Sequence, residues 1–170
     1  MRFGGTRVLL LGAITWVLAA CLSSTSAQAQ PLVHGAVDGR ALIETSGRYG
    51  GAITADLWWG KALLKAGLAA GVGAVSNRRD ASSRVFTPLG LSLSLAPKAP
   101  DTSGPLATLR LGFAPGAQKG GFVVAGWASC ALGYRFSLGE GASLRLGADA
   151  WFLIGKQGGV FFGPFLGLGF

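Results

Sequence analysis

Few side chains in this sequence are placed for catalysis or for binding a cofactor. His34 is the only histidine of the 170 residues, and no serine shares its neighbourhood, whereas nucleophilic catalysis needs a nucleophile beside a base. The cysteines, histidine and carboxylates show no metal-ligand spacing. The glycine-rich run of residues 67–73 lacks the Lys-Ser/Thr ending of a phosphate-binding loop. We therefore expect no enzymatic activity, no metal and no cofactor.

The residues that could do chemistry are instead acids and bases spread along the chain. Side chains of both signs that enter one apolar interior have to pair with each other. An excess of arginine could alternatively favour anions in a narrow pore. The candidate charge network has nine members: Asp38, Arg40, Glu44, Asp56, Lys65, Arg110, Arg135, Arg145 and Asp149. Arg84 is also expected to face inward, by the strand pattern described next.

The elements that carry these residues are expected to be β-strands, because apolar and polar residues alternate. In residues 143–154 the even positions are all apolar, while the odd positions include Arg145 and Asp149. After residue 30 the longest stretch without a charged residue has 15 residues, too short for a helical span. Since lipid accepts only helices and closed barrels, this apolar chain indicates a transmembrane β-barrel.

Composition and length lead to the same fold class. Half of the residues are hydrophobic, 13% are charged and 29 are glycine, which excludes a disordered chain, a coiled coil and a collagen. Pro88 and Pro164 lie inside expected strands and predict a bulge or an early strand end. We predict an all-β fold, an antiparallel up-and-down transmembrane β-barrel of about eight strands, in residues 33–45, 51–59, 62–75, 84–95, 107–113, 122–137, 143–154 and 160–170.

The amino terminus has the layout of a targeting segment. Residues 1–29 read as a secretory signal peptide, with two early arginines, an apolar stretch and a final Ala27-Gln28-Ala29. Residues 30–170 would then form the barrel domain. In the alternative, residues 1–20 are removed and Cys21 is lipidated, because residues 18–21 resemble the lipobox of bacterial lipoproteins.

The last strand carries the most specific resemblance. Val160, Phe162, Pro164, Leu166, Leu168 and Phe170 occupy alternate positions, and the chain resembles the small eight-stranded outer-membrane β-barrel proteins of Gram-negative bacteria. The resemblance implies that Phe170 is the signal read by the barrel-assembly machinery. It also implies a location in the outer membrane, with outer-membrane lipid as surroundings and a monomeric state.

The net positive charge of the chain suggests an anionic partner. The formal charge is +8 at pH 7, but the bases are scattered and nucleic acid is not an expected partner. Anionic lipopolysaccharide is the expected counter-charge for bases in the outer loops, namely Arg48, Arg78, Arg79, Lys119 and Lys156.

The function expected from the sequence is non-enzymatic, with a role in envelope structure or surface interaction. Charge pairing would plug the narrow interior of an eight-stranded barrel. One alternative is a small anion-preferring pore, which inward glycines would favour by leaving space. The other is a membrane-anchored lipoprotein, whose β-barrel or β-sandwich binds a small apolar ligand.

Overall fold

The described part of the chain consists almost entirely of strands. The computed structural model describes residues 33–60, 63–77, 83–96, 102–118, 121–155 and 158–170. Among them there is no helix long and apolar enough to cross a membrane. The strands of this part are β1 (Val33–Ile43), β2 (Arg48–Trp59), β3 (Leu64–Asn77), β4 (Ser83–Phe86), β5 (Leu89–Leu95), β6 (Gly104–Gln118), β7 (Gly121–Gly139), β8 (Ala142–Ile154) and β9 (Gly159–Gly169).

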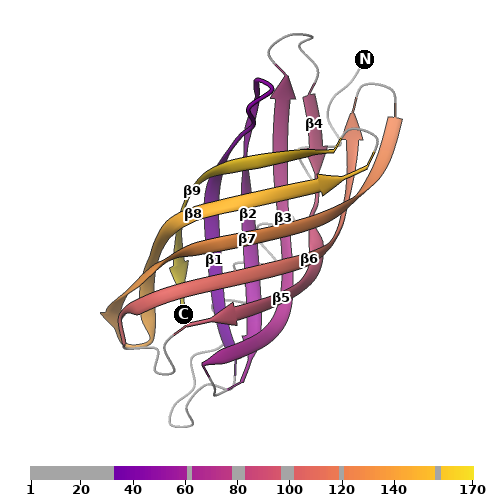
Figure 1. Ribbon diagram of the computed structural model, residues 1–170. Helices are drawn as coiled ribbons and strands as arrows, with labels where there is room; N and C mark the ends of the chain where they lie inside the picture. Colours follow the sequence, from indigo (N-terminus) through magenta and orange to yellow (C-terminus); the bar gives the residue numbers. More distant parts are fainter. Residues whose placement is uncertain (1–32, 61–62, 78–82, 97–101, 119–120, 156–157) are drawn as a thin grey trace, which may run out of the picture. The chain divides into compact units, whose positions relative to one another are not determined.

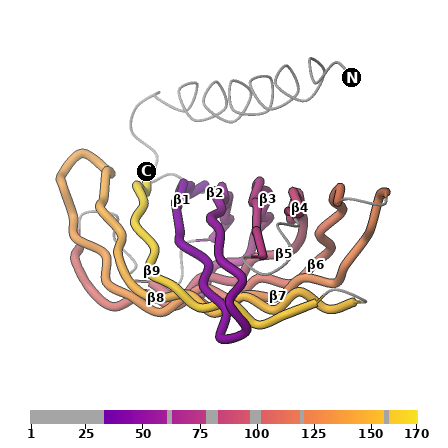
Figure 2. The backbone as a smooth tube through the Cα atoms, turned by 90° about the horizontal axis from the view of Figure 1, so that it is seen from above, coloured from indigo at the N-terminus to yellow at the C-terminus, as the bar shows by residue number. Residues whose placement is uncertain are grey.

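These strands join into one closed antiparallel ring. β1 pairs with both β2 and β9, which links the first strand to the last. β4 and β5 both lie between β3 and β6, and they keep the same register on each side. They are therefore two halves of one interrupted strand, and the described residues form a ring of eight strands when β4 and β5 are counted as one. Figures 1 and 2 show β1–β3 in indigo and magenta and β6–β9 in orange to yellow, running in different directions across the ring. The predicted fold class is confirmed.

The interruption between β4 and β5 lies at Pro88, where the sequence predicts a bulge or a strand end. Proline has no N–H to give to a ladder, but its carbonyl accepts a hydrogen bond from Gly71 N–H at 2.9 Å. Thr87 N–H donates to the carbonyl of Pro115 at 2.8 Å. Because the carbonyl of Pro115 points toward Thr87, its missing N–H also faces the interruption between β4 and β5. Pro88 and Pro115 therefore lie at one interruption of the ladder, and the register is the same on both sides of it.

This arrangement explains where the predicted strand ends are wrong. The sequence predicts that this strand ends at residue 113, but β6 continues to Gln118, with Pro115 opposite Val124 of β7. Pro115 is tolerated because its missing donor faces the interrupted strand and not β7. Pro164 also lies within a continuous strand, opposite Ala148 of β8. On the side of Pro164 that faces β1, the ladder has no residue pair between Arg40–Phe165 and Ile43–Phe162.

Side chains alternate between an exposed outer face and a buried inner face. The outer face is apolar, with Leu91, Leu111 and Phe113 exposed to 67%, 66% and 68%. Trp59 and Tyr134 also lie on this face, whereas Trp58, Trp127 and Trp151 are buried inside, as the alternation predicts. The buried charged residues all lie on the inner face, so the ring has an apolar outside and a partly charged core.

Candidate functional site

Six charged residues meet inside the ring, and we call them the central cluster: Asp38, Arg40, Asp56, Arg110, Arg145 and Asp149. They come from β1, β2, β6 and β8, and every one of the six side chains is at most 5% exposed. Three carboxylates face three arginines, so the formal charges of the cluster cancel. Balance of this kind is required, because an unpaired buried charge is strongly unfavourable.

Arg110 is the hub of the central cluster. Its Nε donates to Asp56 Oδ1 at 2.9 Å and its Nη2 donates to Asp56 Oδ2 at 2.8 Å, which is the strong fork arrangement of arginine and carboxylate. Nη2 also lies 3.2 Å from Asp38 Oδ2, and Nη1 lies 3.6 Å from Asp149 Oδ2. One guanidinium thus contacts all three carboxylates of the cluster.

The other two arginines complete the network. Arg40 donates to Asp149 and lies 3.3 Å from Asp38 Oδ2. Arg145 Nη1 lies 3.2 Å from Asp38 Oδ1, on the opposite side of that carboxylate. Asp38 therefore contacts Arg40, Arg110 and Arg145, and the six residues form one connected network instead of separate pairs.

Neutral polar side chains and aromatic rings enclose the central cluster. Ser92 Oγ donates to Asp56 at 2.8 Å and accepts from the indole of Trp58 at 2.9 Å. The indole of Trp151 donates to Asp149 at 2.9 Å. The guanidinium of Arg40 lies over the ring of Trp151, and that of Arg145 lies over the ring of Trp58, which adds cation–π attraction. The interior is filled with side chains around the charges.

Inward glycines make room for this filling. A Cβ atom at Gly147 would lie 2.7 Å from the Phe165 ring, and one at Gly73 would lie 2.5 Å from the Phe86 ring. Both rings are almost fully buried, with 3% and 0% of their surface exposed. The space that these glycines leave is therefore occupied by aromatic side chains and does not form a channel.

Glu44 lies apart from the central cluster, in the turn between β1 and β2. Its carboxylate accepts from the guanidinium of Arg48, whose Nη2 also donates to the carbonyl of Gly158 at 2.7 Å. The hydrogen bonds from Arg48 lower the pKa of Glu44 below its ordinary value. Arg48, expected to face lipopolysaccharide, thus holds a turn together at this end of the ring.

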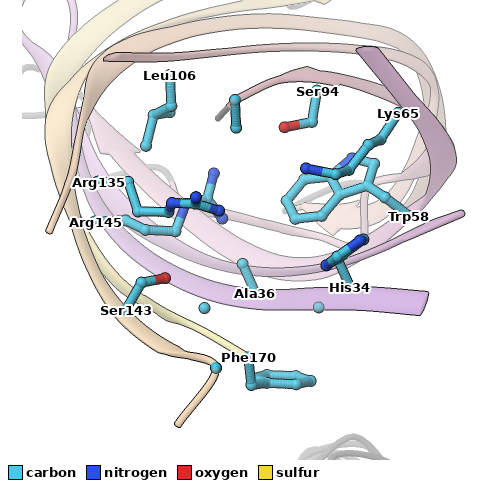
Figure 3. Close-up of a pocket in the computed structure, with 14 residues that line it drawn as sticks. His34, Ala36, Trp58, Lys65, Ser94, Leu106, Arg135, Ser143, Arg145 and Phe170 are labelled. Carbon is cyan, nitrogen blue, oxygen red and sulfur yellow. The ribbon is translucent and has the colours of Figure 1, made fainter. Parts of the chain in front are cut away.

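Lys65 and Arg135 also lie outside the central cluster, in a small cavity at the end of the ring where β1 begins (Figure 3). The cavity has a volume of about 40 Å³. Among the residues that the structure describes, its titratable lining is His34, Lys65, Arg135 and Arg145, and we call it the basic pocket. Arg135 donates to the backbone carbonyl of Thr102 at 2.8 Å.

The basic pocket brings His34 into one cavity with Ser94 and Ser143, which their separation in sequence conceals. In the described part of the chain, no hydrogen bond joins His34 to either serine. Its Nε2 lies 3.2 Å from the carbonyl oxygen of Gly60 instead. Across these same ranges, no three His, Cys, Asp or Glu residues are grouped so as to hold a metal ion.

The remaining predicted residues are dispersed. Arg84 is buried, on the inner face at the end of the ring opposite the basic pocket. Phe170 is 39% exposed, and its backbone N–H and carbonyl pair with those of Gly35 at 2.9 and 2.8 Å. The signal-peptide segment 1–29 and Cys21 lie outside the described residues, as do four bases expected in outer loops: Arg78, Arg79, Lys119 and Lys156.

Comparison with known proteins gives a structural likeness only. No protein-family model matches the sequence, and no curated protein matches it. Neisserial surface protein A is similar in structure, with a TM-score of 0.57 and 14% identity over 81% of this chain and 94% of that protein. The N-terminal β-barrel domain of Pseudomonas aeruginosa OprF gives a TM-score of 0.49 and 16% identity, over 81% of this chain and 97% of that one. The chain therefore has the fold of the small outer-membrane β-barrels that its sequence resembles.

Proposed function

We propose that this chain is a non-enzymatic outer-membrane β-barrel with a closed lumen and a role in envelope structure or surface interaction. The observation that carries the proposal is the central cluster. Three carboxylates and three arginines, all nearly inaccessible to water, are connected across the interior. Eight strands leave an interior only wide enough for side chains, and here charged and aromatic side chains fill it.

The outer face supports a location in lipid. Large apolar side chains cover the outer face along every described strand, and several of them are more than 60% exposed, including Leu91, Leu111 and Phe113. Such a continuous apolar surface would favour aggregation in water, whereas a membrane-spanning barrel requires it. Trp59 and Tyr134 lie near strand ends on this face, where aromatic side chains form the interfacial girdles of outer-membrane barrels.

The partners that belong to this proposal are outer-membrane lipid and lipopolysaccharide, with the barrel-assembly machinery recognising the strand that leads to Phe170. The monomeric state belongs to the same proposal, and it is supported by the described strands, which close into a ring and leave no edge strand for pairing with a second copy. Residues 1–29 serve as the signal peptide. If the mature chain instead began at a lipidated Cys21, the mass of its first peptide would carry the acyl chains.

Three measurements test this proposal. Cell fractionation should recover the protein with the outer membrane, and its migration on a gel should change when the sample is boiled. Liposomes that contain the folded protein should not swell in solutions of small sugars or salts. Recovery as a soluble periplasmic protein would contradict the membrane assignment, and swelling at the rate of porin-containing liposomes would contradict the closed lumen.

A further inference from the structure

The ring closes where β1 meets β9, and we call this junction the β1–β9 seam. On its other side, β1 pairs with β2 along its whole length, from Val33 to Ile43. At the seam, β1 pairs with β9 only over residues 36–40 and at Ile43. Because lipid offers no partner for an open strand edge, contacts that hold this seam together stabilise the ring as a whole.

Phe170 extends the seam by one residue pair beyond the end of β9. Its N–H donates to the carbonyl of Gly35 at 2.9 Å, and the N–H of Gly35 donates to the carbonyl of Phe170 at 2.8 Å. The aromatic ring of Phe170 lies on the outer side of β1, away from Arg145 and the other side chains of the lumen (Figure 3). Both the backbone and the side chain of Phe170 therefore contact β1.

Gly35 is the residue of β1 that makes room for this aromatic ring. A Cβ atom at Gly35 would overlap the ring, at 2.5 Å from Cζ of Phe170, and the three atoms nearest to it all belong to Phe170. Gly35 is buried although it occupies an outward position, between Val33 and Val37. An aromatic ring that covers a glycine on the neighbouring strand stabilises the pairing of the two strands.

A second glycine receives a side chain across the same seam, on the inner face. Gly167 of β9 pairs with Asp38 of β1, and a Cβ atom at Gly167 would overlap Oδ1 of Asp38. This carboxylate of the central cluster thus reaches from β1 onto β9, whereas Phe170 reaches from the end of β9 onto β1. One side chain on each face therefore holds the seam, in addition to the ladder itself.

We propose that Phe170 and Gly35 form a clasp that keeps the ring closed, with the aromatic ring of Phe170 holding β1 against β9. This role belongs to the folded barrel and is separate from the recognition of Phe170 by the assembly machinery. The two residues lie at opposite ends of the described chain, so the clasp forms only when the ring closes. Contacts that form late in folding mainly slow unfolding, and loss of the clasp should therefore speed it.

Urea unfolding of the purified protein, refolded in uncharged micelles, tests the clasp without any assembly machinery. Phe170→Ala should unfold about tenfold faster than the wild type, and Phe136→Ala less than about threefold faster. Phe136 is the matched control, because it is an outward phenylalanine at the same end of the ring, 42% exposed against 39% for Phe170, but lies on β7. Equal acceleration by the two variants, or none by Phe170→Ala, would overturn the proposal.

A double-mutant cycle links the effect to the contact itself. Gly35→Ala should also speed unfolding, because its Cβ displaces the aromatic ring, and it should add less than about twofold once Phe170 is replaced by alanine. Gly39→Ala is the control on the same strand, since its Cβ would meet a backbone oxygen at an ordinary 3.8 Å. Additive effects of Gly35→Ala and Phe170→Ala would show that the two residues are not coupled and would refute the clasp.

Hydrogen exchange shows where the ring opens. Hydrogen bonds of an antiparallel strand alternate between its two neighbours, and the Gly35–Phe170 pair identifies the odd residues of β1 as those that face β9. In Phe170→Ala, or in Phe170→Leu if the alanine variant does not fold, the amides of Val37 and Gly39 should exchange about tenfold faster. The even residues of 36–40, which face β2, should keep their exchange rates. Uniform acceleration along β1 would mean general destabilisation and would contradict a clasp at the seam.

Discussion

Replacing Arg110 with methionine should destabilise the barrel far more than replacing an arginine at its rim. Methionine keeps much of the side-chain volume but removes the guanidinium that contacts all three carboxylates of the central cluster, at 2.8, 3.2 and 3.6 Å. Three carboxylates would then face two arginines in a site that is 0–1% exposed. Removal of one partner from a buried ion pair costs about 3–5 kcal/mol.

The same reasoning predicts a rescue. In the double variant Arg110→Met with Asp56→Asn, two carboxylates face two arginines and the charges balance again. We expect the second substitution to recover about 2 kcal/mol of the loss. Arg48→Met is the control, because the pair that Arg48 makes with Glu44 is partly exposed and contributes about 1 kcal/mol or less.

Urea unfolding in lipid vesicles measures these differences. Tryptophan fluorescence is a suitable signal, because Trp58 and Trp151 pack against the central cluster. The reasoning would be refuted if Arg110→Met cost less than about 1 kcal/mol, or if the two substitutions were additive. Either result would mean that the charges are not coupled, or that water reaches them.

Three further predictions concern the outer face, the filled interior and a turn. Leu111→Arg, in the middle of β6, should lower the free energy of unfolding in a bilayer by about 2–4 kcal/mol, whereas Leu138→Arg at a strand end should cost about 1 kcal/mol or less; equal costs in urea titrations would contradict the lipid-facing assignment. Gly73→Val should cost at least about 1–3 kcal/mol, because its Cβ would overlap the ring of Phe86, and Phe86→Ala should partly rescue it in the same assay. The pKa of Glu44 is lower in the folded protein than in the unfolded chain. The ionised carboxylate therefore contributes to the free energy of unfolding above the unfolded pKa of about 4.3, and this contribution is lost as the pH falls through the pKa of the folded protein. Glu44→Gln should therefore reduce stability at pH 7 by about 1 kcal/mol or less and have no effect near pH 2; a difference that grows toward acid pH would contradict this assignment.

Alternation of residue types is enough to predict most of the fold. A side chain one position along a strand points to the opposite face, and a barrel in lipid has to keep every outward position apolar. Leu111 and Arg110 are neighbours in sequence, yet one is 66% and the other 1% exposed. Strand ends are harder to predict. Pro115 does not end β6, because its missing N–H faces the interruption between β4 and β5 and not β7.

The charge network could be predicted only in part, because alternation gives the face of a residue but not its height in the ring. Asp56 and Arg110 lie at the same level through the register of four strands, although 54 positions separate them. Glu44 and Lys65 have the same inward parity, but Glu44 lies in a turn at one end and Lys65 lines the basic pocket at the other. Which charges meet depends on strand tilt and register, which no local pattern encodes.

Inward glycines illustrate the same limit. In sequence they are compatible with an open pore or with close packing. The rings that fill the space beside Gly73 and Gly147 belong to other strands. Only the assembled ring shows that Phe86 and Phe165 occupy this space, and this contact decides between the two readings.

Single-channel recording in planar bilayers tests the closed lumen most directly. The purified, heat-modifiable protein should insert without stable conductance steps, because the central cluster and the aromatic rings leave no continuous aqueous path. Arg110→Met, which unbalances the cluster, should show more current noise than the wild type if it remains folded. Reproducible, anion-selective steps from the wild-type protein would contradict the account and would establish a pore.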